Sequence, residues 1–446
     1  MTQPVPEATP SPTLFRRGWD LIRRMKAVLL GAGARSGYLS AADQSIISVT
    51  NFAASLMLAR QVNVTEFGVY GVGFTLVSLV EAFQEGLIIQ PLNTFGAALG
   101  LEDFRRYASL SLLLQVGLIG LASLLAALIG WVLFATGNVV AGRTILALSW
   151  VGATWQLQKF LRRMFYTRGQ LRVAITNTVL TSTVRIVALV WLGNHTVVTG
   201  ITGLNAIAIG TLTGTLLGLW HGRRYWTWRF PAVREIIVRD FKFGRWVTGG
   251  TVSNWMTLQF YPVLVAWLTS FASAGAYRAI QNLVAPVHLL LYATDTFLVP
   301  RTAKQFVDIG RESLDRTINL IYIFIGIPVI GLLILVSIFA VPLLRLLYGE
   351  TYVAYAKGVP LMALFYFLWY LYWPLQIGFK AIRQTRPIFI ANLLAIFSML
   401  TIGIALIYRW DVYGTLAGQI LSALIVAIIL GFAWWRLTLK SQDFGT

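Results

Sequence analysis

Apolar segments of about 20 residues follow one another along nearly the whole 446-residue chain, and this succession limits the fold more than any other feature. A segment of that length crosses the hydrocarbon core of a bilayer as a helix. Hydrophobic residues make up 57% of the chain and charged residues only 12%, too few charges to cover a soluble protein of this size. The sequence therefore predicts an all-α polytopic membrane protein.

The hydropathy pattern predicts twelve transmembrane helices. They are expected at residues 41–60, 68–91, 107–135, 141–161, 173–192, 200–220, 246–270, 275–299, 318–346, 353–379, 387–408 and 413–435. Before them, the stretch from Leu14 to Leu29 has an apolar face flanked by arginines, which predicts an amphipathic helix on the anionic inner leaflet. Residues 1–40 and 436–446 are the terminal tails.

Lysine and arginine residues gather on one side of this topology. Of the 36 in the chain, 29 lie in the tails and in the connections that follow an even-numbered span. Such a bias marks the cytoplasmic side, so both termini are predicted to be cytoplasmic. It also accounts for the net charge of +19 without a nucleic-acid partner.

Two patterns in the first half of the chain return in the second. Phe67-Gly68-Val69-Tyr70 aligns with Ala274-Gly275-Ala276-Tyr277 at an offset of 207 residues, and residues 167–177 align with 382–392 at an offset of 215. A duplicated bundle follows, with one six-helix lobe at 41–220, a cytoplasmic linker at 221–245 and a second lobe at 246–435. Transporters built from repeats bind substrate between the halves, so the two pseudo-symmetric lobes are expected to surround a central cavity.

Two acidic residues lie one helical turn apart in the second span, Glu81 and Glu85. A charge at the centre of a bilayer costs about 2.5 kcal/mol or more, so such residues usually face a cavity or a partner. Two carboxylates this close in a low dielectric would not both stay ionised, which predicts proton or cation coupling. The alternative is that one glutamate pairs with Arg185 or reaches the headgroups.

The eighth span carries a polar stripe on a helix expected to bend at Pro286. Gln281, His288, Tyr292 and Asp295 recur on one face of that helix. Asp295 is a third candidate for ion coupling, or it lies near the inner interface. His288 either contacts substrate or is a packed, hydrogen-bonded histidine.

Three arginines are candidates for binding an anionic group. Arg185 is the only basic residue in mid-span, and it either neutralises an acid or presents a fixed positive charge to a substrate. Arg60 and Arg278 lie near the outer ends of their spans, where they bind a phosphate or anchor to headgroups. Gln281, Asn282 and His288 complete this candidate substrate site.

A basic cluster at the inner end of the fourth span contains Lys159, Arg162 and Arg163, with no acid near it in sequence. Membrane topology alone explains it, and it also suits the reception of a diphosphate at the cytoplasmic leaflet. The chain has no cysteine, and its three histidines show no metal-ligand spacing, so neither a metal nor another cofactor is expected.

Three segments resemble bacterial polysaccharide exporters of the Wzx type, which belong to the multidrug/oligosaccharidyl-lipid/polysaccharide (MOP) superfamily. They are SLMLARQVNVTEFGVYGVGFTLVSLV (55–80), AGAYRAIQNLVAPVHLLLYATDTFLVPR (274–301) and LLRLLYGETYVAYAKGVPLMAL (343–364). The resemblance implies a non-enzymatic flippase of the bacterial inner membrane that moves undecaprenyl-diphosphate-linked oligosaccharides for O-antigen, capsule or exopolysaccharide export. It also implies coupling to an H+ or Na+ gradient, and as partners membrane lipids, a polysaccharide polymerase and chain-length proteins.

Two other functions remain open. A multidrug or cation antiporter of the same superfamily would need acidic cavity residues with few arginines, and Arg185 and Arg278 disfavour it. A membrane glycosyltransferase or polymerase would need a substantial outward loop, and none is expected here.

Overall fold

The computed structural model describes residues 32–227, 233–288, 290–291, 302, 311–382 and 384–442. All secondary structure in these ranges is helical. The first half of the chain forms α2 (Ala32–Ala59), α3 (Val64–Gln84), η1 (Glu85–Ile89), η2 (Leu92–Gly96), α4 (Leu101–Ala135), α5 (Val139–Thr167), α6 (Leu171–His195), α7 (Gly200–Gly222) and η3 (Arg223–Tyr225). The second half forms α8 (Val233–Gln259), α9 (Tyr261–Leu268), α10 (Phe271–Val284), α12 (Arg311–Ile338), α13 (Ala340–Tyr348), η4 (Glu350–Tyr355), α14 (Gly358–Ala381), α15 (Arg386–Ser398), η5 (Met399–Gly403) and α16 (Ile404–Gln442).

The twelve expected spans lie mostly on helix where the structure describes them, with short breaks such as those at Phe260, at Phe339 and at residues 356–357. Seven helical runs among the described residues are long and apolar enough to cross a membrane, which agrees with a multi-pass membrane protein. The last run, Arg386–Leu437, contains the eleventh and twelfth expected spans and turns back at Asp411, where φ is 52°. The expected amphipathic helix Leu14–Leu29 lies outside the described residues.

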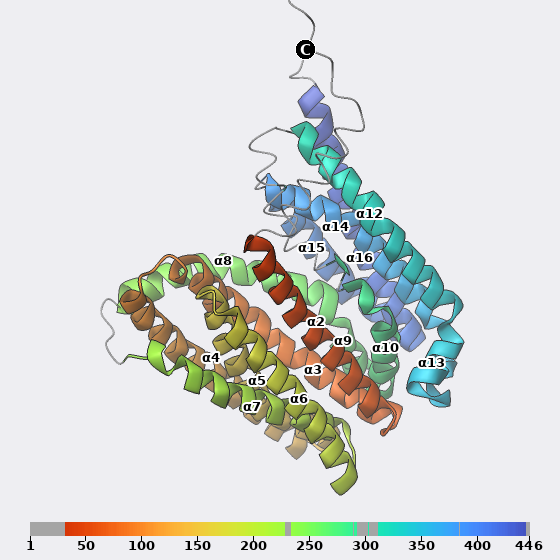
Figure 1. Cartoon of the computed structure of the whole chain (residues 1–446). Coiled ribbons are helices and arrows are strands. Elements are labelled where there is room, and N and C mark those ends of the chain that lie inside the picture. Colours follow the sequence, from red (N-terminus) through yellow and green to blue (C-terminus); the bar gives the residue numbers. More distant parts are fainter. Residues whose placement is uncertain are drawn as a thin grey trace, which may run out of the picture.

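The helices gather into two groups that meet along α3 and α10 (Figure 1). Helices α2 to α7 form the first lobe, and α9, α10 and α12 to α16 form the second. Within the lobes, α4 packs on α5, α6 on α7, and α14 on α16. We call the end at which α2 ends and α3 begins the outer end, following the orientation that the charge distribution predicts.

The duplicated pattern is visible in how α3 and α10 begin. The side chain of Asn63 caps α3 by accepting a hydrogen bond from the amide of Glu66 (2.9 Å). Ser270, at the same offset of 207 residues, caps α10 by accepting one from the amide of Ser273 (3.1 Å). Both caps satisfy an amide that the first turn of a helix leaves free, so the two helices start at equivalent positions.

The aligned glycines Gly68 and Gly275 lie face to face where α3 crosses α10. A Cβ added to Gly68 would lie 1.7 Å from the carbonyl oxygen of Phe271, and one added to Gly275 would lie 2.0 Å from that of Val64. Phe271 and Val64 are themselves 207 residues apart, so the contact is the same from both sides, as at a two-fold axis. Only glycine permits this backbone approach, which makes the seam between the lobes tight at this point.

Helix α8 packs against both lobes. Trp255 donates from Nε1 to Ser78 Oγ (2.8 Å), and the hydroxyl of Thr251 donates to the carbonyl of Ala82 (2.9 Å), which ties α8 to α3. The same helix packs on α15 of the second lobe. Because α8 begins at Val233, part of the stretch expected to be the linker is helical and continuous with the seventh span.

Candidate functional site

One face of α3 and its continuation η1 carries four side chains that each meet a neighbouring helix. Tyr70, Phe74, Glu81 and Glu85 follow one another at spacings of four, seven and four residues, which keeps them on one helical stripe. Tyr70 lies nearest the outer end and Glu85 nearest the inner end. The candidate site is therefore a column along α3 rather than a single cluster.

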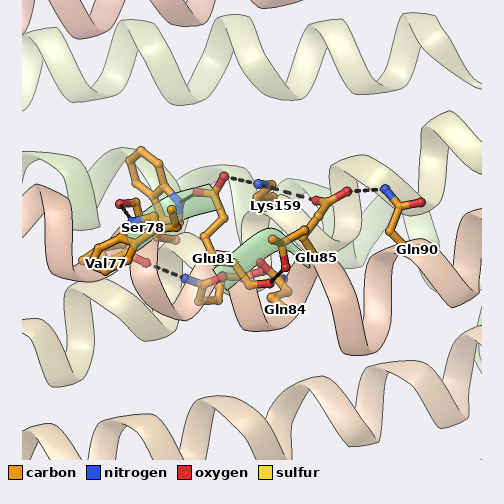
Figure 2. A network of polar contacts seen from close by, with 12 residues as sticks. Val77, Ser78, Glu81, Gln84, Glu85, Gln90 and Lys159 are labelled. Carbon is orange, nitrogen blue, oxygen red and sulfur yellow. Dashed lines mark hydrogen bonds and ion pairs between the residues drawn. The ribbon is translucent and has the colours of Figure 1, made fainter. Parts of the chain in front are cut away.

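At the inner end of the column, Glu81 and Glu85 share one ammonium group (Figure 2). Lys159 on α5 forms an ion pair with Glu81 and lies 3.8 Å from Glu85 Oε2. Trp155 donates from Nε1 to the other oxygen of Glu81 (2.9 Å), and the Gln90 amide donates to Glu85 Oε1 (2.9 Å). The side chains of Lys159, Glu81 and Glu85 are 12%, 28% and 19% exposed, so the group is partly buried and carries a formal charge of −1.

The partner of the acidic pair differs from the one weighed in the sequence. Neither Glu81 nor Glu85 forms an ion pair with Arg185 in the described part of the chain. Lys159 takes that place because α5 packs along α3 and brings residue 159 beside residue 81. Arg163, one turn further along α5, also acts on Glu81 electrostatically.

Three buried glutamines fix α3 against α4 and α5 next to the acidic pair. Gln84 donates to Gln115 Oε1 (3.0 Å) and to the carbonyl of Gln156 (2.7 Å), and Gln156 donates to the carbonyl of Val77 (3.1 Å). All three are almost fully buried. Such hydrogen bonds between helices restrict rotation of α3, so Glu81 and Glu85 are held facing Lys159.

Of the three basic residues expected to receive a diphosphate at the inner leaflet, two are paired with acids in the structure. Besides Lys159, Arg162 forms an ion pair with Asp43 Oδ2 on α2 (2.7 Å), and the hydroxyl of Tyr166 donates to the same oxygen (2.5 Å). Asp43 is only 2% exposed. The sequence did not suggest Asp43 because it lies 119 residues from Arg162, at the start of the first span, where an acid looks like a surface residue.

Arg185 is 5% exposed, yet it meets no carboxylate among the residues that the structure describes. Its guanidinium donates to Asn51 Oδ1 (2.5 Å) and to the hydroxyl of Tyr70 (2.9 Å), both neutral. Its Nε is buried and has no hydrogen-bond partner there. Of the two roles that the sequence left open, this arrangement favours a fixed positive charge.

Arg278 approaches the same turn of α3 from the second lobe. Its guanidinium lies 5.0 Å from the ring of Phe74 and donates to Gln281 Oε1 (3.0 Å). Its side chain covers Gly71, and its Nε too is buried without a partner in the described residues. Because Tyr70 and Gly71 are neighbours, Arg185 and Arg278 flank one turn of α3 from opposite lobes.

Of the remaining candidates in the eighth span, two have contacts in the structure and two lie outside the described residues. Asn282 donates to Ser55 Oγ across the seam (2.8 Å). The ring of His288 lies 4.9 Å from that of Tyr366 and 4.6 Å from that of Trp369, so it is packed among aromatic rings, as in the second interpretation of this residue. Helix α10 ends at Val284, just before Pro286, while Asp295 and Tyr292 lie outside the described residues.

Arg60 was expected to bind a phosphate or lipid headgroups, but in the structure its guanidinium meets the protein backbone. Its guanidinium donates to the carbonyl of Leu347 (2.9 Å) and to that of Leu346 in the second lobe. Arg60 is thus bound to the protein backbone in this structure, and it joins the outer end of α2 to the end of α13.

Comparisons with known proteins agree with the family and fold inferred from the sequence. The family described as Polysaccharide biosynthesis protein matches residues 57–357. No curated protein matches the chain. Among solved structures, a multidrug resistance MATE family transporter of the MOP superfamily in an inward-facing conformation is 15% identical, with a TM-score of 0.69 over 89% of this chain and 95% of that one.

Two further solved structures share the fold. The lipid II flippase MurJ in an inward closed conformation is 14% identical, with a TM-score of 0.67 over 89% of this chain and 87% of that one. A MOP superfamily transporter from Pyrococcus furiosus, described by the reverse polarity of its binding pocket, is 15% identical, with a TM-score of 0.61 over 92% of this chain and 96% of that one. Because the family match covers well over half of its length, this chain belongs to the polysaccharide biosynthesis protein family, and it has the two-lobed helical fold of the MOP superfamily.

Proposed function

We propose that this protein is a flippase that moves undecaprenyl-diphosphate-linked oligosaccharide units across the bacterial inner membrane by alternating access. The observation that carries the proposal is the pair Arg185 and Arg278, which flank one turn of α3 from the two lobes. The family match supports a role in polysaccharide biosynthesis, and the likeness of the fold to that of MurJ, a lipid II flippase, supports a lipid-linked substrate.

The chemistry of the arginine pair suits a diphosphate. Arg185 lies in mid-span, where an arginine costs about 2.5–3.5 kcal/mol, so an arginine there without a carboxylate partner usually serves a function. Guanidinium groups bind phosphate oxygens through parallel hydrogen bonds, and each of these two retains a buried Nε without a partner in the described residues. The polyprenyl chain would stay in lipid while the diphosphate and glycan pass between the lobes.

We infer that Glu81 and Glu85 couple transport to an H+ or Na+ gradient, with Asp295 as a further candidate. Two carboxylates share one lysine, so one negative charge is left uncompensated within the group. A proton or a monovalent cation would balance it, and its binding would favour one of the two lobe arrangements. No other cofactor enters the proposal.

Lys159, Arg162 and Arg163 remain our candidates for receiving the diphosphate at the cytoplasmic leaflet. Since Lys159 and Arg162 are ion-paired in this structure, reception would require exchange of a carboxylate for a phosphate. The same proposal makes membrane lipids, a polysaccharide polymerase and chain-length proteins the expected partners.

The antiporter alternative has one observation in its favour, the net negative charge of the Glu81–Lys159–Glu85 group. A cationic drug would, however, meet Arg185 and Arg278 at the next turns of the same column. A glycosyltransferase would need an outward catalytic loop, whereas outer connections such as Thr136–Asn138 and Thr196–Thr199 are short.

The test uses the purified protein in liposomes that contain a fluorescent undecaprenyl-diphosphate-linked oligosaccharide. Loss of fluorescence to a membrane-impermeant quencher measures flipping. Arg185→Gln and Arg278→Gln are each expected to lower the flipping rate about tenfold or more, because each removes charge-assisted hydrogen bonds worth about 1.5–3 kcal/mol.

The matched control is Arg143→Gln, which removes an exposed arginine near the outer start of α5 and is expected to leave the rate unchanged. Flipping at the original rate in both arginine variants would contradict the proposed site. Export of a cationic dye without any flipping of the lipid-linked sugar would favour the antiporter instead.

A further inference from the structure

The short helix α13 and the following turn η4 lie at the outer end of the molecule, where the two lobes meet (Figure 1). α13 ends at Tyr348, and the next residue, Gly349, has a φ of 96° and turns the chain sharply into η4. One side of the segment is exposed, including Leu346, and the other side buries Tyr348 and Tyr352. Both elements belong to the second lobe by sequence, yet their buried side faces the first lobe.

Aromatic rings join this segment to α3. The ring of Phe67 lies 6.0 Å from that of Tyr348 and 6.1 Å from that of Tyr352, and Phe67 is itself fully buried. Arg278 and Tyr70 lie close enough to the hydroxyl of Tyr348 to act on it electrostatically. Tyr348 therefore packs on Phe67, one turn outward from the Tyr70–Gly71 turn that Arg185 and Arg278 flank.

Arg60 fastens the segment from the first lobe. The last carbonyl groups of a helix have no partner within the helix and carry a partial negative charge. At the end of α13, Gly349 satisfies the carbonyls of Leu344 and Arg345, and the guanidinium of Arg60 satisfies those of Leu346 and Leu347. A single side chain of α2 thus completes the end of a helix in the other lobe.

We propose that α13 and η4 form a lid that closes the Arg185–Arg278 site towards the outer face, and that Arg60 is the latch of this lid. The inference deepens the proposed function, because it assigns the outward gate to the same site. Opening at the outer end separates Arg60 from Leu346 and Leu347, Phe67 from Tyr348, and Asn282 from Ser55. The contacts within each lobe are left in place.

The chain contains no cysteine, so a single introduced thiol reports on the gate without interference. Ser55 is 2% exposed and lies under the seam, where it accepts a hydrogen bond from Asn282. The Ser55→Cys variant is placed in intact cells, and a membrane-impermeant methanethiosulfonate reagent is added from outside. The rate of labelling measures how often the outer end opens.

Adding Arg60→Ala to this background is expected to raise the labelling rate about tenfold, because it removes two hydrogen bonds from a charged donor. Arg60→Lys keeps the charge but not the two-pronged geometry, and an intermediate rate is expected. The control is Arg345→Ala, which breaks the ion pair with Glu350 within the same segment and spans no lobe boundary. Its labelling rate is expected to stay within twofold of the background.

An unchanged rate in Arg60→Ala, or an equal increase in Arg345→Ala, would overturn the assignment of Arg60 as a latch. Folding is followed by the thermal unfolding of each purified variant, and only variants with the parent transition are compared. The labelling assay needs no substrate. If Arg60→Ala is labelled faster but the protein with Arg60 intact flips no lipid-linked sugar, the lid stands and the proposed function is rejected. If that protein flips the sugar but Arg60→Ala is labelled at the unchanged rate, the proposed function stands and the latch is rejected.

Discussion

The two lobes place different chemistry at equivalent positions. The second and eighth spans are compared at the offset of 207 residues that aligns the facing glycines. The fourth and tenth spans are compared at an offset of 214 residues, one less than the offset between residues 167–177 and 382–392. The three matched positions hold Glu81, Trp155 and Lys159 in the first lobe and His288, Trp369 and Trp373 in the second. In the first lobe they form an ion pair and a hydrogen bond, and in the second their rings pack edge to face.

This difference shows how a duplicated scaffold acquires one functional column. The helix starts, the facing glycines and the aligned tyrosines are shared by both copies, and the glycines permit the close packing of α3 on α10. The charged groups at the matched positions are confined to the first copy. Alternating movement of two similar lobes can then be biased by ion binding in one of them.

The largest effect is expected when the charge of the first lobe is removed. Lys159→Met leaves two carboxylates without their ammonium partner, and we expect a loss of about 2–3 kcal/mol in unfolding free energy. This lies at or below the lower end of the range for fully buried pairs, since Glu81 and Glu85 are partly exposed. Thermal unfolding of the purified protein measures it, and the loss is expected to shrink at low pH as protonation removes the unpaired charges.

Trp373→Met, at the matched position, is the control for this experiment. It reduces ring packing against Trp369, and its cost is expected to be independent of pH. A loss in Lys159→Met that did not change with pH would show that the two positions differ only in shape.

The aligned tyrosines give a second, smaller difference. The hydroxyl of Tyr70 accepts from Arg185 (2.9 Å), whereas that of Tyr277 donates to Gln419 (2.8 Å). Tyr70→Phe is expected to cost about 2 kcal/mol and Tyr277→Phe about 1 kcal/mol, because hydrogen bonds to charged groups are the stronger ones. Equal losses in chemical or thermal unfolding would mean that Arg185 finds another partner.

A third difference concerns the turn between the fifth and sixth spans of each lobe. In the first lobe Glu66, on α3, accepts from the amide of Gly200, the first residue of α7 after the turn (2.7 Å). In the second lobe the acid is on the turn itself, where Asp411 accepts from Thr269 and Ser273 (both 2.7 Å). Ser273 is the residue aligned with Glu66. The acid therefore lies on the second span in the first lobe, whereas in the second lobe that position holds the donor and the acid lies on the turn.

Asp411→Ala is expected to cost about 1 kcal/mol, since the site is exposed and two hydrogen bonds are lost. Asp411→Asn is expected to cost about half as much, because its amide oxygen can still accept and asparagine tolerates positive φ. The two variants are compared by thermal unfolding. An equal loss in both would assign the effect to charge rather than to hydrogen bonding and backbone conformation.

The smallest effect is expected at an exposed ion pair at the outer end of the ninth span, which shows what such a pair contributes when solvent screens it. The hydrogen-bonded guanidinium of Arg345 lowers the pKa of Glu350 below its ordinary value (N–O distances of 2.7 and 2.9 Å). A lowered folded-state pKa stabilises the protein above the unfolded value of about 4.3, and this stabilisation is lost as the pH falls through the folded pKa. Glu350→Gln is expected to flatten the fall of Tm slightly between about pH 5 and 3.

The hydropathy and charge patterns predicted much of the fold. Twelve spans, two lobes and the alignment of Tyr70 with Tyr277 follow from periodicity and spacing, which are local properties of the chain. The polar residues in the spans were also visible, because any charge in a long apolar segment is conspicuous. Spacing could not show which of them meet, since the partners of Glu81 and Arg162 lie 78 and 119 residues away.

Sequence alone determined that this chain is a duplicated, multi-pass helical protein with unpaired charges to accommodate in its spans, because lipid requires apolar segments of fixed length and penalises every charge. Only the tertiary structure decided where the charges went. It paired Lys159 with the two glutamates, left Arg185 and Arg278 without a carboxylate among the described residues, and bound Arg60 to the end of α13. The physical reason is that a charge pairs with whatever helix packing brings within a few ångströms, and packing is a property of the whole fold.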